Sequence, residues 1–303
     1  MDDIRLVNVF THQGQGGNPC PIAIDAAGWG EEDMQAVARR FGHESGFVLP
    51  AASADFDYMF RFWVPRHEME MCGHATIGAL WCLARAGRLA ADQVRIATRS
   101  GPVTGYVGLD PSGQPSIEIS QPVGKVVDLT PAEEADVLST LKLTQNDLLD
   151  LPIQNAVTSR VKTLIPMKNP ERLNALVSDM ARTEACCERI GSTGLYPYAI
   201  GDQAGRRFEA RQFPKSSGYP EDAATGIAAA ALAFGLLQNG LVSQDSRRIT
   251  ILQGRAMGSL SEIGVRLGFA DDRPVGCLLG GAVSLAEQGD RHGTGDHLAE
   301  GTA

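Results

Sequence analysis

Three chemically active residue types follow one another where an apolar segment begins: Cys72, Gly73 and His74, in HEMEMCGHATIGALW (residues 67–81). A thiol, a glycine and an imidazole at such a point suit a metal site, a nucleophile or a pocket for an anion. The Ala- and Leu-rich stretch from His74 to Ala86 predicts a helix closed by Gly87. Since a helix N-terminus offers unpaired N–H groups and about half a positive charge, we favour the anion pocket.

The other two chemistries are weaker. Cys72 and His74 are two residues apart on a turn, and the histidines at 12, 43 and 67 follow no ligand spacing, so we predict no metal. A nucleophilic Cys72 would need His74 as its base, and no third orienting partner is evident. A thiol enzyme stays open as a hypothesis that alkylation of Cys72 would test.

A second turn of small residues opens another apolar helix, at EDAATGIAAAAL (residues 221–232). In both places a strand ending in proline leads to an acidic residue, a small-residue turn and an Ala/Leu helix. Aligning Glu70 with Glu221 without gaps places Cys72 on Ala223 and His74 on Thr225. This internal repeat predicts two similar domains, each with a helix inside a sheet-rich shell. If the two helix starts face each other, they form a floor for carboxylate or carbonyl oxygens.

The stretch GHESGFV (residues 42–48) offers an acid/base group, because Glu44 lies between a helix stop and an apolar strand. We expect Phe41, Phe47 and Val48 to surround it with a medium of low dielectric, which raises the pKa of a carboxyl toward neutrality. The alternative is a solvated loop glutamate. Asp222 raises the same question at the second helix, where the alternative is a capping aspartate.

Hydrophobic periodicity and turn signals indicate a mixed α/β fold. We expect helices over 31–41, from Thr130-Pro131 onward, and from Asn169-Pro170 to about Cys187, the second with a capping box. The expected strands cover residues 4–10, 45–50, 55–64, 93–98, 102–109, 115–120, 195–200, 206–213, 248–253, 261–269 and 275–284. GQGGNP (residues 14–19) lacks the Lys-Ser/Thr ending of a phosphate loop, which favours a tight turn.

Composition limits the classes of function. The chain has 303 residues, 43% of them hydrophobic and 21% charged, as is usual for globular proteins. No apolar run is long enough to predict a membrane span, and the net charge of −9 disfavours nucleic acid. The start shows no secretion signal, and the six cysteines form no CxxC pair. We therefore expect a cytoplasmic protein with reduced thiols.

The motifs in combination resemble the PhzF family, the phenazine-biosynthesis-like isomerases related in fold to diaminopimelate epimerase. They keep their order over nearly the whole chain: GGNP (16–19), HESGFV (43–48), EMEMCGHATIGA (68–79), EDAATGIAAAAL (221–232) and QGRAMG (253–258). The resemblance implies two pseudo-symmetric α/β domains, each a sheet wrapped round a central helix, with the active site between them. We expect an N-terminal domain over 1–121 to which a strand at 275–285 returns, a C-terminal domain over 122–274, and a disordered tail over 286–303.

The resemblance also implies residue roles. Glu44 would take a proton from one carbon and return it to another, with Asp222 and His74 as the other catalytic residues. The implied substrate-binding residues are Gly73, Cys72, Asn18, Thr225, Gly226 and Ile227. Family members need neither metal nor organic cofactor and often form homodimers, so the expected partners are a small carboxylate substrate and a second copy of the chain.

Departures from the family pattern bear on the substrate. Ala223 stands where the family usually has proline, Ile227 where it has serine, and His43 where serine often precedes the glutamate. The last motif ends in Gly258-Ser259-Leu260-Ser261 in place of Gly-Arg-Pro-Ser. Losing the serine hydroxyl removes a donor, which argues against the dihydro-hydroxyanthranilate of phenazine pathways as substrate. Cys72 occupies the first thiol position of the related epimerases, but its repeat counterpart is Ala223, which excludes a two-thiol racemisation.

The sequence thus predicts a cofactor-independent isomerase with Glu44 as general acid/base in an interdomain cleft. The alternative is a catalytically altered family member that acts as a binding or interaction protein, with which Ile227 and Ser259 are compatible.

Overall fold

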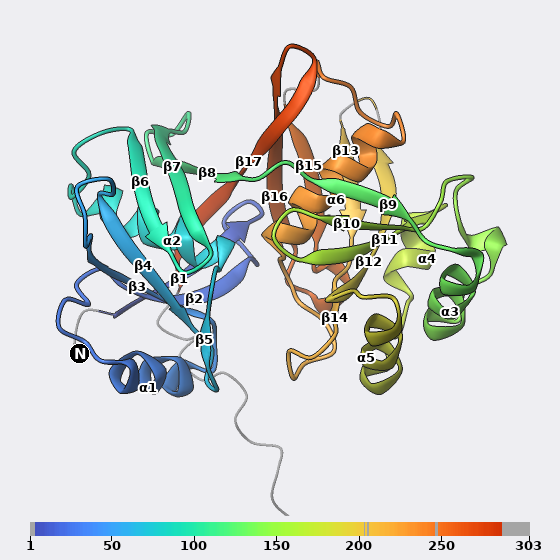
Figure 1. Ribbon diagram of the computed structural model, residues 1–303, viewed down its shortest axis with the longest axis horizontal. Helices are drawn as coiled ribbons and strands as arrows, with labels where there is room; N and C mark the ends of the chain where they lie inside the picture. The colour runs from blue at the N-terminus through green and yellow to red at the C-terminus, as the bar shows by residue number, and fades with distance from the viewer. Residues whose placement is uncertain (1–3, 203, 205, 246–247, 287–303) are drawn as a thin grey trace, which may run out of the picture.

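The computed structural model describes residues 4–286 except 203, 205, 246 and 247. Its strands join in one sheet of 17 strands, and Figure 1 shows this sheet curling into two halves, each around one helix. The fold is mixed α/β, as the sequence predicted. None of the described helices is long and apolar enough to span a membrane. The predicted tail, apart from Ala286, lies outside the described residues.

The N-terminal half wraps strands around α2 (Gly73–Arg85), which contacts β1, β2, β3 and β8. Helix α1 (Glu31–Phe41) covers the outer face of β2, β3 and β4 and ends at Gly42, whose φ of 71° is the left-handed conformation of a C-terminal cap. The strands of this half are β1 (Ile4–Thr11), β2 (Asn18–Ala23), β3 (Ser45–Pro50), β4 (Tyr58–Trp63), β5 (Glu68–Met69), β6 (Gln93–Thr98), β7 (Gly101–Leu109) and β8 (Pro115–Gln121).

The C-terminal half repeats this plan around α6 (Gly226–Gln238), while α3 (Pro131–Leu141), α4 (Pro170–Asn174) and α5 (Met180–Arg189) lie outside the sheet (Figure 1). The strands here are β9 (Lys125–Asp128), β10 (Gln154–Val157), β11 (Val161–Met167), β12 (Gly194–Asp202), β13 (Arg207–Ala210), β14 (Phe213–Pro214), β15 (Ile249–Gln253) and β16 (Ser261–Ala270). Two short 3₁₀ helices cover Gln145–Asp147 and Arg255–Met257.

Strand β17 (Arg273–Leu285) connects the halves. It pairs with β16 along its first part and with β8 from Cys277↔Gln121 to Gly281↔Ile117. Its last residues then pair with β1, from Ala282↔Thr11 to Leu285↔Val7. The predicted domain boundaries, including the strand at 275–285 that returns to the N-terminal domain, stay a prediction.

The central helices are nearly all buried, because Ala and Gly let the surrounding strands approach closely. In α6, a Cβ on Gly235 would lie 2.4 Å from a side-chain carbon of Leu164. Both helices have 13 residues and begin at a glycine, Gly73 and Gly226. Aligning the two helix starts places Gly73 on Gly226 and Cys72 on Thr225. The ungapped sequence alignment, which placed Cys72 on Ala223, was therefore wrong by two residues.

The helix predicted from Pro170 to Cys187 is wrong, because the chain leaves the helix after Asn174 and starts α5 at Met180. Two interactions favour the break. Asp179 caps α5 by accepting from the Arg182 backbone N–H at 3.1 Å. Buried Arg211 donates to the carbonyls of Leu173, Asn174 and Leu176, at 3.1, 3.2 and 2.7 Å, so the groups that an unbroken helix would have paired stay satisfied.

Candidate active site

Glu44 lies immediately before β3, at the end that faces the first turn of α2. Gly42 ends α1 and turns the chain, and Gly46 then lets β3 pack against α2: a Cβ on Gly46 would lie 3.3 Å from Cβ of Ala75. The Cys20 thiol donates to the backbone carbonyl of Glu44 at 3.0 Å. The sequence therefore positions Glu44 through two small residues and a thiol.

The surroundings predicted for Glu44 were wrong in one respect. Phe41 and Met34 of α1 pack with Phe47 and Trp63, in the cluster between this helix and the sheet. The groups near the carboxyl are instead Cys72 and His74, which come from the N-cap and first turn of α2.

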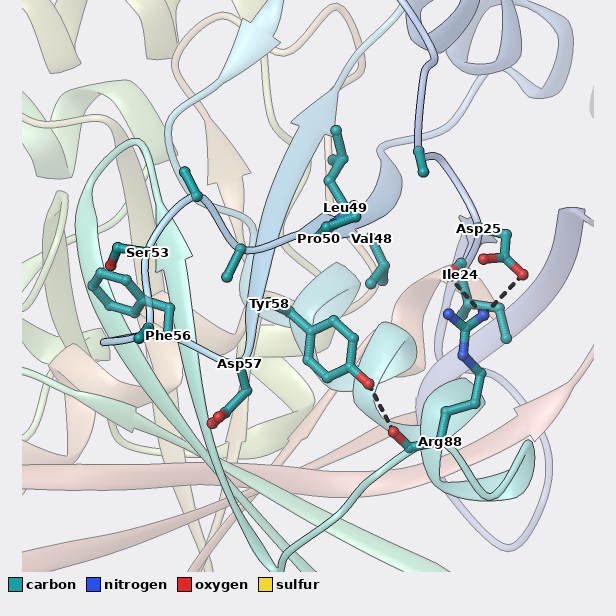
Figure 2. Close-up of a pocket in the computed structure, with 14 residues that line it drawn as sticks. Ile24, Asp25, Val48, Leu49, Pro50, Ser53, Phe56, Asp57, Tyr58 and Arg88 are labelled. Carbon is teal, nitrogen blue, oxygen red and sulfur yellow. Dashed lines mark hydrogen bonds and ion pairs between the residues drawn. The ribbon is translucent and has the colours of Figure 1, made fainter.

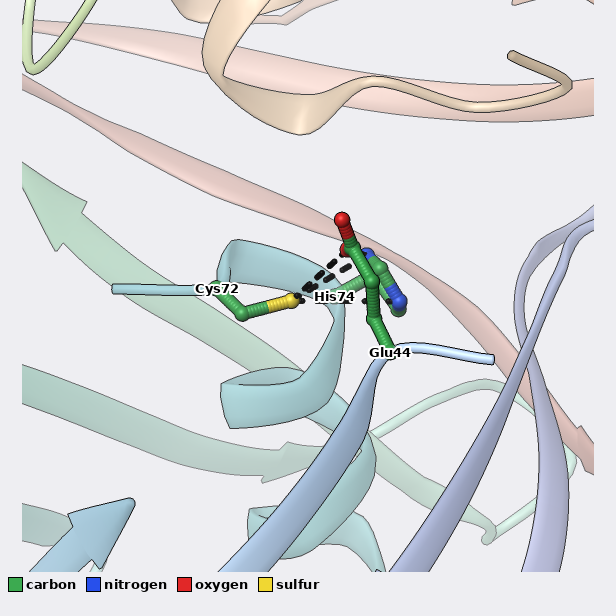
Figure 3. A group of neighbouring side chains, drawn as sticks. All are labelled: Glu44, Cys72 and His74. Carbon is green, nitrogen blue, oxygen red and sulfur yellow. Dashed lines mark hydrogen bonds and ion pairs between the residues drawn. The ribbon is translucent and has the colours of Figure 1, made fainter. Parts of the chain in front are cut away.

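Figure 3 shows Glu44, Cys72 and His74 converging on one point. The Cys72 thiol donates to Oε2 of Glu44 at 3.3 Å, and Nδ1 of His74 lies 3.6 Å from the same oxygen. The distance from Sγ of Cys72 to Nδ1 of His74 is 3.5 Å. The side chain of Glu44 is 28% exposed and that of His74 is 7% exposed, so the carboxyl is the member of this cluster that a ligand can reach.

Burial sets the protonation states of this cluster. It raises the pKa of Glu44, an effect that the Cys72 hydrogen bond and the charges of Arg160 and Lys162 partly offset. Burial lowers the pKa of His74 to about 4, so this imidazole is neutral at pH 7. It also raises the pKa of Cys72 well above 9.0, with the Glu44 charge acting in the same direction. A protonated thiol is a poor nucleophile, which argues against the thiol-enzyme hypothesis.

The same cluster has the shape of a small metal site, since one ligand atom from each of Glu44, Cys72 and His74 lies within 4.8 Å of the others. Sequence spacing did not reveal this set, because Glu44 is 28 residues from Cys72. Metal binding would require Cys72 to lose its proton, which burial and the adjacent carboxyl disfavour. The absence of a metal stays a prediction.

Asp222 precedes α6 and is held there by three side chains. Asn18 Nδ2 donates to its Oδ1 at 3.1 Å, and the Thr225 hydroxyl donates to its Oδ2. Gln253 Nε2 donates to its backbone carbonyl at 2.7 Å. Burial, followed by the charge of Glu44, raises the pKa of Asp222 to about 6. Because Asn18 lies at the start of β2, it ties the N-terminal half to the entrance of α6.

The starts of α2 and α6 meet at Leu279 of β17. A Cβ on Gly73 would lie 3.4 Å from Cδ2 of this leucine, and a Cβ on Gly226 would lie 2.6 Å from the same atom. The positive ends of both helix dipoles are therefore close together, and Ile227 lies partly exposed in the first turn of α6. All nine residues selected from the sequence thus belong to two adjoining sets, one at each helix start.

Sequence reasoning assigned no role to three residues that border this site. Gln253 is fully buried and accepts from the Tyr196 hydroxyl at 2.9 Å while it holds Asp222. Tyr219 lies in the loop before α6, where burial and the charges of Asp222 and Glu44 raise its pKa. Lys162 of β11 is only 5% exposed, and burial lowers its pKa to about 8. A lone lysine in the apolar run VKTLIPM was the available signal for Lys162.

A separate cavity of about 640 Å³ lies at the far end of β3, beside Val48, Leu49 and Pro50 (Figure 2). Several of its polar groups already have partners. Arg88 pairs with Asp25 at 2.8 Å, and the Tyr58 hydroxyl donates to the Arg88 carbonyl at 2.7 Å. This cavity lacks the acid/base groups of the helix starts, so it is a weaker candidate for the site of reaction.

Comparison with known proteins places this geometry in context. Residues 7–288 match the family model PhzC-PhzF, described as phenazine biosynthesis-like protein. The Escherichia coli O157:H7 protein named uncharacterized isomerase YddE is 31% identical over 284 residues, covering 92% of this chain and 94% of its own. Trans-2,3-dihydro-3-hydroxyanthranilate isomerase of Pseudomonas aeruginosa is 27% identical, and the match covers 88% of this chain and 91% of that protein. The crystal structure of the Bacillus anthracis phenazine biosynthesis protein, PhzF family, superimposes with a TM-score of 0.82 at 24% identity, and the match covers 94% of this chain and 96% of that one.

Proposed function

The chain belongs to the phenazine biosynthesis-like PhzC-PhzF family, and on this premise we propose that it is an isomerase in which Glu44 moves a proton between two carbons of a small carboxylate. One observation carries the proposal: a partly exposed carboxyl with a raised pKa stands beside two adjoining helix N-termini. A base of this kind removes protons near neutral pH, and the helix ends stabilise the negative charge that results.

The proposed reaction has two proton transfers. The Glu44 carboxylate takes a proton from a carbon next to an unsaturated or carbonyl system, and the electron pair of the broken C–H bond delocalises toward an oxygen of the substrate. The backbone N–H groups near Gly73 and Gly226 stabilise that oxygen. The protonated Glu44 then returns the proton to a different carbon. Substrate and product have the same composition, so no oxidant or reductant takes part.

The remaining residues act on position and charge in this scheme. Neutral His74 and ionised Asp222 orient the substrate or relay protons near Glu44. Asn18 and Thr225 hold Asp222 in place, and Ile227 supplies an apolar wall. The Cys72 thiol donates to Glu44 and limits the rise of its pKa. A homodimer in the cytoplasm stays a prediction of the sequence.

Solvent exchange tests the role of Glu44 even while the natural substrate is unidentified. The protein is incubated in D₂O with single compounds, beginning with trans-2,3-dihydro-3-hydroxyanthranilate and continuing through small unsaturated and amino carboxylates, and loss of C–H signals is followed by NMR. In Glu44→Gln, exchange and turnover should fall by about 10²–10⁴ or more. Exposed Glu32, on α1, provides the matched control Glu32→Gln, which should keep full activity.

Two outcomes would contradict the proposal. Unchanged exchange in Glu44→Gln would remove this residue from the chemistry. Tight binding of a compound that wild-type protein never labels would favour the alternative, a family member that binds small acids without converting them.

A further inference from the structure

Lys162 is a buried cation without a partner among the described residues. On β11, Ile165 and Met167 pack in the cluster under α3 and α5, whereas Leu164 packs against Gly235 of α6. Side chains alternate along a strand, so Lys162 lies on the same face as Leu164, toward α6. It is 5% exposed, and within the described part of the chain no hydrogen bond or ion pair reaches its ammonium group.

Gln212 is a second unsatisfied polar side chain, and it lies next to Lys162. The parallel register Thr163↔Leu195, extended back by one residue, sets Lys162 beside Gly194 on the same face of the sheet. A Cβ on Gly194 would lie 2.1 Å from Nε2 of Gln212, so the Gln212 amide fills the space beside the lysine. Gln212 is 1% exposed, and neither of its amide atoms has a hydrogen-bond partner among the described residues.

These two residues border the proposed reaction site. The Asp222 backbone N–H donates to the Gln212 carbonyl at 3.0 Å, which fixes Gln212 beside the entrance of α6. The charges of Asp222 and Glu44 both act on Lys162, yet neither carboxyl pairs with it. The Asp222 carboxylate instead accepts from Asn18 and Thr225.

A second cation acts on the same region. Arg160 is exposed in the turn between β10 and β11, has no pairing partner among the described residues, and acts electrostatically on both Lys162 and Glu44. The largely buried Lys162 next to the unsatisfied Gln212 amide is costly in an empty site, since buried polar groups and charges normally have partners. A negatively charged ligand group with several acceptor oxygens would pair with both cations and with the NH₂ of Gln212.

We propose that Lys162 and Gln212 form a subsite for a second acidic group of the substrate, so that the enzyme acts on a small dicarboxylate or a carboxylate with another oxyanion. This inference rests on the proposed function, because it assigns the first carboxylate to the two helix starts and the acidic proton to Glu44. Lys162 donates to the second group as a charged donor, and Gln212 adds its NH₂. Arg160 draws the dianion toward the site.

Matched probes test the subsite. Succinate, fumarate and glutarate are compared by calorimetry at pH 7 with butyrate, crotonate and valerate, which keep the chain length and lack one carboxylate. Wild-type protein should bind at least one dicarboxylate about 10- to 100-fold more tightly than its partner compound, as expected for hydrogen bonds to charged groups. Lys162→Met should abolish this preference and leave monocarboxylate affinity unchanged. Lys162→Arg should keep part of it, and Gln212→Leu should reduce it.

The control is Lys168→Met, which removes one positive charge from the exposed position after the other end of β11 and should keep the full preference. Absence of any dicarboxylate preference in wild-type protein, or its survival in both Lys162→Met and Gln212→Leu, would overturn the proposal. Glu44→Gln separates the two proposals, because it should lose proton exchange and keep the preference. Exchange that persists in Glu44→Gln would refute the proposed chemistry while leaving the subsite intact.

Discussion

Replacing Lys162 with Met should stabilise the fold. The pKa of Lys162 falls from 10.5 to about 8 in the folded protein, chiefly through burial. A tenfold change in proton affinity is worth about 1.4 kcal/mol, so the charged lysine costs about 3 kcal/mol at pH 7. Met keeps the unbranched apolar stem and removes the charge, so most of this cost should appear as an increase in the free energy of unfolding.

The effect should depend on pH in a defined direction. Below pH 8 the lysine is protonated in both the folded and the unfolded chain, so the full cost is present. Between about 8 and 10.5 the unfolded chain binds the proton that the folded chain has lost, and wild-type stability attributable to this group rises with pH. The advantage of Lys162→Met should therefore shrink across this window and nearly vanish above it.

Urea unfolding at pH 7 and at pH 10 measures this effect, with equal m-values as the check on comparable transitions. Lys168→Met is again the control, and it should change the free energy of unfolding by less than about 0.5 kcal/mol because Lys168 is exposed. A Lys162→Met protein that is no more stable than wild type at pH 7, or equally stabilised at both pH values, would refute the view that this ammonium is buried at a cost.

Three further predictions concern the site and its supporting turns. In Glu44→Gln the pKa of Asp222 should fall below its value of about 6, because a neighbouring negative charge is lost. Carboxyl ¹³C NMR would measure this pKa, and an unchanged value would disprove the electrostatic coupling between Glu44 and Asp222. Cys72→Ala should move the acid limb of the kcat/KM profile to higher pH, because the pKa of Glu44 rises when its hydrogen-bond donor is lost, whereas Cys72→Ser should leave this limb in place. Rapid alkylation of Cys72 at pH 7 would contradict a protonated thiol. Gly254→Ala should lower the free energy of unfolding by about 2 kcal/mol or more, because the added Cβ would lie 2.3 and 2.9 Å from two backbone oxygens. Gly28 has a similar φ and open space around it, so urea unfolding should show a much smaller loss for the control Gly28→Ala.

Local signals in the sequence predicted several elements well. Helix α1 was predicted with its observed bounds, because a periodic apolar face runs up to Gly42. The start of α3 was predicted from the Thr130–Glu133 capping box, which the structure contains. These features depend on neighbours a few residues away, so a single sequence is sufficient to identify them.

Features that depend on distant partners were missed or wrong. The predicted helix through residue 175 was wrong because Arg211, far along the chain, satisfies the carbonyls where α4 ends. The β10–β11 hairpin was not predicted, and Lys162 was missed with it. The helix-start residues could be selected from turn chemistry and the family resemblance, whereas the convergence of Cys72 and His74 on Glu44 depends on how β3 packs against α2.

The position of β17 has a consequence for how the chain folds during synthesis. This strand leaves the ribosome after every other described element, yet it fills the space between β1 and β8. Until it emerges, those two strands expose unpaired edges, which are templates for association with other chains. The first half of the protein therefore cannot complete its sheet until β17 is available, and its two open edges stay exposed to association with other chains until then.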